Sequence, residues 1–378
     1  MLSIRLLQRM DFRIIPVIAM LMGIGVLIIS SFSMEHPLEG ADETFFTPTV
    51  VKQIKFIVIG WVFYFTAALF DYNRLREWTW FLYALMLAAL VGLFFTGAIQ
   101  GVHRWYRLPG LGMNFQPSEY AKLVVVISLS WFLERNHERS MDLSTAIKGC
   151  LIVGIPFILI LKEPDLGTAL VLVPITLVMF YFGNIHPLVI RVLTGASLAG
   201  LLMSVLFLTG VLSHDELRPV VTKFIKEYQY ERLSPNVPHQ KASQMAIAIG
   251  GWAGTGWRKS EYTAGGWLPT PYTDSVFPAF GEEFGLVGLI FLLFLFYLLL
   301  YFSFQVTTMA KDHFGRLLAA GISVYLAMHV VVNVGMMCGL LPITGVPLIL
   351  VTYGGTSLIS TMTSLGLLQS ICSRRYMF

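Results

Sequence analysis

The chain has 378 residues, of which 56% are hydrophobic and only 13% are charged, and its formal net charge is +4. A mean hydropathy of +0.71 is far above that of a soluble protein, so the sequence indicates a polytopic membrane protein. The basic residues are spread over many loops, and no basic patch predicts binding to nucleic acid.

We predict an all-α fold, a single membrane domain over residues 1–378 with about ten transmembrane helices. Each apolar run is close to the roughly 20 residues that a bilayer core requires. The first run is long for a signal peptide and no convincing cleavage site follows it, so we interpret it as a retained span. The predicted spans cover residues 13–33, 51–70, 78–97, 118–134, 144–161, 166–183, 187–210, 282–306, 315–341 and 348–372.

Lys and Arg in the short loops concentrate on the side of the N-terminus, which predicts that this side is cytoplasmic. An even number of spans then places both termini in the cytoplasm. One large loop, about 211–281, is predicted to be extracytoplasmic. Between Leu217 and Tyr228 its apolar residues recur at helical spacing. This predicts an amphipathic helix, which either lies in the headgroup layer or packs on the bundle.

The stretch RW, Arg104–Trp105, comes before FQPSEYAK, where the fourth span begins. Ser118 suits the N-cap of that span. Glu119 and Lys122 are three residues apart, so they can pair on one helix face. Two interpretations remain open: a buried pair that ties helices together, or a site where Arg104 and Lys122 bind an anionic headgroup. Trp105 is also explained by an interfacial anchor.

Two further polar patterns follow along the chain. In KEPDLGTAL, Pro164 ends one span and Asp165 can cap the next. His329 and Asn333 share one helix face, where we expect hydrogen bonds between helices.

The segment WLPTPYTDSVFPAFGEE places Asp274 beside the eighth span. A carboxylate next to a bilayer needs a partner, water or a function. Pro269, Pro271 and Pro278 predict an extended, non-helical backbone, which is tolerated at membrane depth only against protein or a wet cavity. We therefore expect Asp274 to face such a cavity, although an exposed loop acid or a turn cap would also fit.

Glu282 and Glu283 are predicted in the first turn of the eighth span. The positive helix end stabilises a carboxylate there by about 0.3–1 kcal/mol. Alternatively, with Asp274 nearby, they form an acidic pocket that attracts a divalent cation such as Mg or Mn. The sequence contains no P-loop, HExxH or nucleophile-elbow pattern, and no organic cofactor is expected.

Together these segments resemble the SEDS family of polytopic membrane proteins over nearly the whole chain. The GVPL before VTYGG resembles the elongation-type branch of the family more than the division-type branch. The family usually has a glutamine at Ala242, a glycine and serine at 248–249, and an aromatic or bulky residue at Ser275. The matching stretches are RW, FQPSEYAK, EPDLGTAL, AIGGWAGTGW, LPTPYTDSVF, GEEFGLVG and GLLPITGVPLILVTYGGTSL.

The resemblance implies a peptidoglycan glycosyltransferase that polymerises lipid II on the outer face of the bacterial cytoplasmic membrane. Such enzymes work beside a class B penicillin-binding protein, a transpeptidase, within the elongation or division machinery. The family's catalytic acid maps onto Asp274. Its tryptophan, acid and base in the RW and QPSExAK motifs map onto Trp105, Glu119 and Lys122, and its PDLGT aspartate maps onto Asp165.

On this basis we expect Asp274 to act as the base, with Glu282 or Glu283 nearby to strengthen it. Arg104 and Lys122 are the expected partners of the departing pyrophosphate, with a divalent cation as a further candidate. The other residues expected to bind lipid II are Trp105, Glu119, Asp165, Glu282 and Glu283. An alternative function is a lipid II flippase without polymerase activity. A scaffold that only recruits the transpeptidase is a third.

Overall fold

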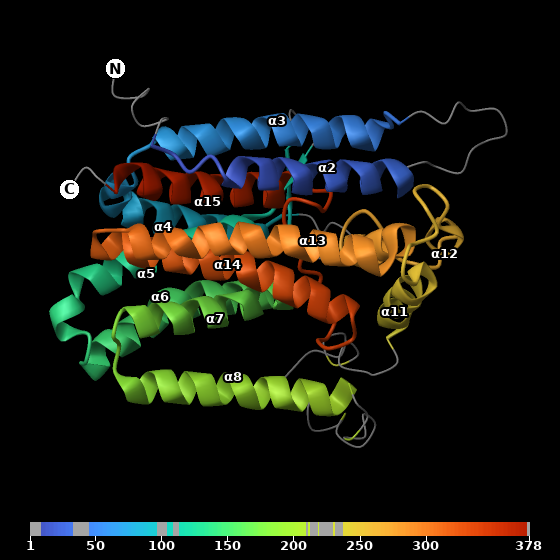
Figure 1. The fold of residues 1–378 in the computed structure, drawn as a ribbon. Helices are drawn as coiled ribbons and strands as arrows, with labels where there is room; N and C mark the ends of the chain where they lie inside the picture. The colour runs from blue at the N-terminus through green and yellow to red at the C-terminus, as the bar shows by residue number, and fades with distance from the viewer. Residues whose placement is uncertain are drawn as a thin grey trace.

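A computed structural model describes residues 9–32, 45–96, 104–108, 113–208, 211, 218, 230 and 237–375. Within these residues the chain forms ten helices of 17 residues or more, one for each predicted span (Figure 1). They are α2 (Ile14–Phe32), α3 (Pro48–Leu69), α4 (Leu75–Leu93), α5 (Pro117–Arg135), α6 (Leu143–Lys162), α7 (Leu166–Phe182), α8 (Pro187–Leu208), α13 (Val276–Met309), α14 (His313–Met337) and α15 (Gly355–Arg374).

In the described part of the chain, six helices are long and apolar enough to cross a membrane by length and composition: α2, α3, α6, α8, α13 and α14. Helix α7 is also apolar but has only 17 residues. Helices α4, α5 and α15 fall outside this group, and of these α5 and α15 are almost wholly buried. Their polar side chains therefore face other helices rather than lipid, which is where a membrane protein tolerates them.

The long helices lie side by side, and α14 packs in the middle against α13, α7 and α5 (Figure 1). Helices α3 and α15 approach each other closely, because a Cβ added to Gly366 would lie 2.4 Å from the carbonyl oxygen of Tyr64. Only glycine permits that spacing. Helix α8 lies at the edge of the bundle against α7. None of the residues in its most apolar stretch is buried inside the protein.

The two ends of the described chain lie together. Gln369 accepts from the Asp11 amide at 2.9 Å and donates to the Asp11 carbonyl at 3.3 Å. Arg374 donates to the Leu69 carbonyl at 2.7 Å, near the end of α3. This is the arrangement that an even number of spans requires. The amphipathic helix predicted over 217–228 lies, apart from Arg218, outside the described residues.

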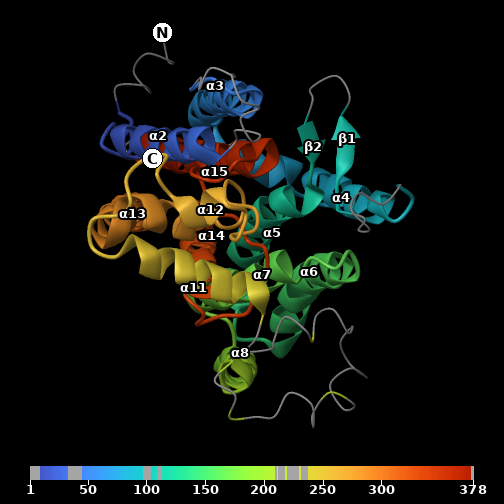
Figure 2. The ribbon, with the colours of Figure 1, turned by 90° about the vertical axis from the view of Figure 1, so that its right-hand side faces the viewer.

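Helices α11 (Pro238–Gly250) and α12 (Glu261–Ala264) lie at the opposite end of the bundle, which we term the α11 end (Figure 1). Figure 2 looks onto this end and shows α11 crossing it. The same view shows a hairpin that the sequence did not predict, in which β1 (Tyr106–Leu108) pairs antiparallel with β2 (Met113–Phe115).

The start of α13 differs from the prediction. The helix begins at Val276 rather than 282, and Pro278 lies in its first turn. The expectation that Pro278 keeps the segment non-helical was therefore wrong, because the amide that proline lacks has no helical partner in a first turn. The helix is instead interrupted at Gly285, which has φ 64° and ψ −166°.

The segment after α11 supplies hydrogen-bond partners to backbone groups of α13 on both sides of the interruption. Two of its amides donate to the last carbonyls before Gly285, and two of its carbonyls accept from the first amides after it. Four backbone groups beside the break are thereby paired, as burial favours. The four bonds, 2.8 to 3.2 Å long, join Thr255 to Glu282, Gly256 to Glu283, Leu286 to Gly251 and Val287 to Trp252.

The last span also begins later than predicted, at Gly355 rather than 348. Residues 338–354 form an irregular segment, which we term the 338–354 segment. Its apolar residues from Leu348 to Val351 are nearly completely buried. Non-helical backbone at this depth is tolerated because protein surrounds it, and the segment brings its carbonyl groups into the bundle.

Candidate functional site

Asp274 lies half-buried in a turn directly before α13. The amides of Thr273 and Ser275 donate to the carbonyl of Thr270 at 3.1 and 3.3 Å. The predicted extended backbone is therefore replaced by a turn. A Cβ added to Gly345 would lie 3.4 Å from Oδ2 of Asp274, so the carboxylate faces a position of the 338–354 segment that has no side chain.

Helix α14 holds both the Asp274 turn and the 338–354 segment. The Asn333 side-chain amide donates to the carbonyls of Asp274 at 3.1 Å and Val346 at 2.8 Å. One turn earlier, His329 Nδ1 lies 3.0 Å from the carbonyl of Pro347. The predicted hydrogen bond between helices is confirmed for His329, which also contacts Lys122 of α5. Asn333 bonds to two non-helical segments instead, and the two residues fix the backbone on two sides of the Asp274 carboxylate.

Behind this turn lies a buried ion pair. Lys122 Nζ is 2.8 Å from Glu119 Oε1 and 2.7 Å from His329 Nε2, and each of the three residues is at most 2% exposed. Since Lys122 can only donate, His329 Nε2 accepts and Nδ1 carries the proton that reaches Pro347. The interpretation of Glu119 and Lys122 as a buried pair that ties helices together is thereby confirmed.

Asp165 has two roles at the start of α7. Its Oδ1 accepts from the Thr168 amide at 3.3 Å, which confirms the predicted helix cap. Its Oδ2 accepts from Ser118 Oγ at 2.9 Å and from Gln116 at 3.0 Å. The prediction that Ser118 is the N-cap of α5 was wrong: Gln116 occupies that position, and the Ser118 hydroxyl joins two helices instead.

Arg104 and Trp105 secure the chain that leads into β1. The Arg104 guanidinium donates to the Glu163 carbonyl at 3.2 Å and also to that of Pro164. The Trp105 indole donates to Gln116 at 3.2 Å. Both side chains are half-buried; Arg104 contacts the loop before α7, and Trp105 contacts the start of α5.

The sequence analysis missed Glu163, which precedes the PDLGT motif directly. The side chain is 1% exposed, and within the described residues neither carboxylate oxygen has a hydrogen-bond partner. Burial, together with the charge of Asp165, raises the pKa of Glu163 to about 8, although Arg104 opposes the shift. The group therefore keeps its proton at neutral pH, and its position at a helix end gave no sign of this.

The N-terminus of α7 contacts the same part of the 338–354 segment that Asp274 faces. A Cβ added to Gly167 would lie 2.8 Å from the Thr344 carbonyl and 2.7 Å from the Val346 side chain. Residues 344–346 therefore lie between α7 and the Asp274 turn. The structure gathers Asp165, the Glu119–Lys122 pair and Asp274 around the 338–354 segment, near the α11 end.

Glu282 and Glu283 accept hydrogen bonds from the segment after α11. Glu282 accepts from the amides of Tyr262 at 3.0 Å and Thr263 at 3.1 Å, and from the Thr263 hydroxyl. It thereby caps α12. Glu283 accepts from the Arg258 amide at 2.8 Å. Neither lies in the first turn of α13, because the helix begins earlier than predicted.

Within the described part of the chain, no group of three or more His, Cys, Asp and Glu side chains could hold a metal ion. Both oxygens of Glu282 already accept hydrogen bonds from Thr263 and Tyr262. We therefore derive no chemical step through a metal.

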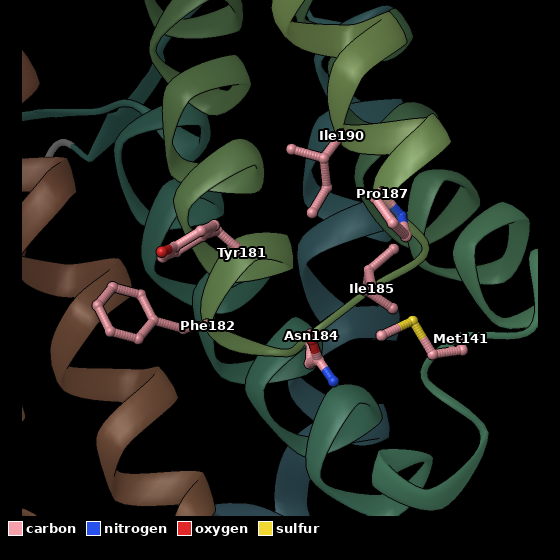
Figure 3. Close-up of a pocket in the computed structure, with 7 residues that line it drawn as sticks. All are labelled: Met141, Tyr181, Phe182, Asn184, Ile185, Pro187 and Ile190. Atoms are coloured by element: carbon pink, nitrogen blue, oxygen red, sulfur yellow. The ribbon is translucent and has the colours of Figure 1, made fainter.

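A pocket lies at the other end of α7, beside the turn into α8 (Figure 3). This is the opposite end of the helix from Asp165, so the pocket is separate from the residues gathered around Asp274. It is lined by Met141, Tyr181, Phe182, Asn184, Ile185, Pro187 and Ile190.

Residues 12–377 match the family model of FtsW, RodA and SpoVE, described as "Cell cycle protein". Peptidoglycan glycosyltransferase MrdB of Escherichia coli (strain K12) is 32% identical over 327 residues, which cover 86% of this chain and 86% of that protein. Probable peptidoglycan glycosyltransferase FtsW of Geobacter sp. (strain M18) is 28% identical over 380 residues, with 98% of each covered. Overall similarity does not separate the two branches of the family.

A solved structure is similar along its whole length. It is described as "Structural coordination of polymerization and crosslinking by a peptidoglycan synthase complex". The TM-score is 0.76 at 27% identity, with 98% of this chain and 99% of that chain covered. The polytopic helical fold therefore agrees with the same family.

Proposed function

Because the chain belongs to the FtsW, RodA and SpoVE family, which is the SEDS family that its motifs indicate, we propose that it is a peptidoglycan glycosyltransferase. Its substrate is lipid II, which it polymerises into glycan strands. The observation that carries this proposal is the position of Asp274. One half-buried carboxylate lies in a turn that α14 anchors, with the motif residues of α5 and α7 gathered around it.

Asp274 is the general base of the proposed reaction. The acceptor hydroxyl attacks the anomeric carbon of a sugar that bears a diphosphate, and the carboxylate takes the hydroxyl proton. The bond to the diphosphate breaks as the glycosidic bond forms. Direct displacement with one base and no protein nucleophile inverts the anomeric centre.

Arg104 is the better placed of the two predicted cations to meet the departing pyrophosphate. Its side chain is half-buried, whereas Lys122 is 1% exposed and already holds Glu119 and His329. Lys122 therefore acts indirectly, because it keeps α5 and α14 together behind the Asp274 turn. Trp105, Glu119 and Asp165 hold the same framework.

A divalent cation, Mg or Mn, stays a prediction. It is tested by assaying polymerisation in EDTA and then restoring each metal. A full rate in EDTA would contradict the requirement.

In this proposal the α11 end faces the outside of the cytoplasmic membrane, and both termini lie in the cytoplasm. A cysteine in place of Trp252, which is 76% exposed at that end, is expected to react with a membrane-impermeant maleimide in intact cells. The variant is made in a chain without its three natural cysteines. If the cysteine reacted only after lysis, the α11 end would face the cytoplasm and the proposed orientation would be wrong.

The partner in this proposal is a class B penicillin-binding protein, a transpeptidase of the elongation or division machinery. The similar solved complex, described as coordinating polymerization and crosslinking, supports this choice. Co-purification of the two proteins from the membrane, and the polymerisation rate with and without the partner, test it. The absence of both a complex and a change in rate would contradict it.

The test of the function uses purified protein and lipid II, and compares the wild type with Asp274→Asn. Loss of a general base typically lowers the rate by about 10²–10⁴-fold, so we expect glycan chains to disappear on the assay's time scale. Asp142→Asn is the matched control, because Asp142 is exposed and its side chain makes no cap hydrogen bond. Polymerisation by a folded Asp274→Asn at the wild-type rate would refute the assignment, and lipid movement without polymer would favour the flippase.

A further inference from the structure

A histidine of α11 contacts the residue that follows Asp274. His239 Nε2 lies 2.7 Å from Ser275 Oγ. Ser275 is completely buried and His239 is half-buried. The contact joins the large loop to the start of α13, and His239 lies outside the stretches that match the family.

The Ser275 hydroxyl is available for this contact because it does not cap its own helix. A serine at an N-cap normally accepts from the second or third amide of the helix. Ser275 is the N-cap of α13 but makes no such bond. Pro278 occupies the third position and has no amide to donate. The hydroxyl is therefore paired with α11 instead.

His239 is held firmly by the helix that carries it. The neighbouring Gln240 donates to the carbonyl of Met336 at 3.1 Å and to that of Leu341 at 2.9 Å. These bonds fix the first turn of α11 to the end of α14 and to the 338–354 segment. Because this turn is fixed, the imidazole of His239 stays in place and holds Ser275 through the hydrogen bond between them.

Asp274 lies between two polar anchors. Asn333 holds its carbonyl from α14 at 3.1 Å, and His239 holds the next residue from α11. We propose that His239 is a positioning residue, which orients the Asp274 carboxylate through the side chain of Ser275. This inference rests on the proposed role of Asp274 as the base.

The pair His239–Ser275 also gives a reason for a departure from the family pattern. Where the family usually has an aromatic or bulky residue after the aspartate, this chain has a small hydroxyl group. Here a directional hydrogen bond to α11 holds the position. A displacement of about 1 Å at a catalytic group can cost about 10²-fold in rate, so a bond of this kind is expected to affect turnover.

The experiment measures kcat and KM for lipid II with the purified full chain. His239→Leu removes the bond and keeps the volume, and we expect kcat to fall about 10- to 100-fold with KM nearly unchanged. His239→Gln can still bond to Ser275 and is expected to recover to within about threefold of wild type. Ser275→Ala breaks the same bond from the other side and is expected to match His239→Leu.

The double variant His239→Leu/Ser275→Ala separates this inference from a general structural effect. If His239 acts through Ser275, the double variant is no slower than either single variant, because residues in contact are non-additive. The proposal would be overturned if the fold-losses in kcat of the two single variants multiplied in the double variant. An unchanged kcat in Ser275→Ala would also overturn it. Met245→Leu, on the exposed side of the same helix, is the control and is expected to keep the wild-type rate.

Asp274→Asn is measured in parallel. If it keeps the wild-type rate, the proposed role of Asp274 fails whatever His239 does. If it is inactive while His239→Leu and Ser275→Ala keep the wild-type kcat, the proposed function stands and the positioning role of His239 is wrong.

Discussion

Lys122 donates to His329 at a distance of 2.7 Å and so joins α5 to α14 inside the bundle. The lysine has one carboxylate partner, Glu119, and all three side chains are nearly inaccessible. A charge pair of this kind contributes little by itself, but the removal of one partner leaves an uncompensated charge.

We expect Lys122→Met to lower the free energy of unfolding by about 3–5 kcal/mol, because Glu119 is then left buried without its cation. Thermal unfolding in detergent measures this. Glu119→Gln/Lys122→Met is expected to recover most of the loss. The exposed Lys148→Met is the control and should change stability by less than about 0.5 kcal/mol. A double variant less stable than Lys122→Met would contradict this account.

Asn333→Leu removes the donor of two carbonyls, that of half-buried Asp274 and that of buried Val346. Each unpaired group costs about 1–3 kcal/mol. We expect a lower unfolding temperature and a fall in kcat of about tenfold or more, because one side of the Asp274 turn is released. Steady-state assays with lipid II measure the second effect. A variant with lower stability but full turnover would show that Asn333 supports the fold and not the position of Asp274.

Glu163 predicts a specific pH dependence of stability. Its folded-state pKa of about 8 is above the ordinary value of 4.5 for a glutamate side chain. Between these values the folded protein keeps a proton that the unfolded chain releases, so stability falls as pH rises through this window and levels off above about pH 8. Glu163→Gln cannot ionise and avoids the loss.

We therefore expect Glu163→Gln and wild type to unfold at similar temperatures near pH 5. The variant should unfold at a temperature several degrees higher than wild type near pH 8, because its side chain cannot ionise. Thermal unfolding at several pH values measures the difference. An equal difference at pH 5 and pH 8 would mean that ionisation of Glu163 is not its cause.

Glu282 is expected to act in stability and not in metal binding. Glu282→Ala leaves the amides of Tyr262 and Thr263 without their buried acceptor, which should lower the unfolding free energy by about 2–4 kcal/mol. The metal dependence of polymerisation, measured by titration after EDTA, should stay that of wild type. A change in the metal concentration needed for half-maximal rate would place Glu282 in a cation site.

Local spacing was enough to predict some of these features. Glu119 and Lys122 lie one helical turn apart, and Asp165 precedes an apolar run directly, so the pair and the cap follow from sequence alone. The ten long helices follow from the apolar runs. The interruption at Gly285 does not, because a glycine in an apolar run is as compatible with close packing as with a break.

The remaining features depend on partners distant in the sequence. Lys122 and His329 are 207 residues apart, and His239 and Ser275 are 36 apart. No periodicity connects such positions. The isolation of Glu163 depends on what surrounds it in three dimensions.

The interruption at Gly285 has a consequence for how this end of the protein opens. The amides of Leu286 and Val287 are protected only while the carbonyls of Gly251 and Trp252 stay in place. Opening of that segment and fraying of α13 are therefore one cooperative event with one free energy. In hydrogen–deuterium exchange these amides should gain deuterium at a common rate with Thr255 and Gly256, so two stretches some thirty residues apart would report as a single unit.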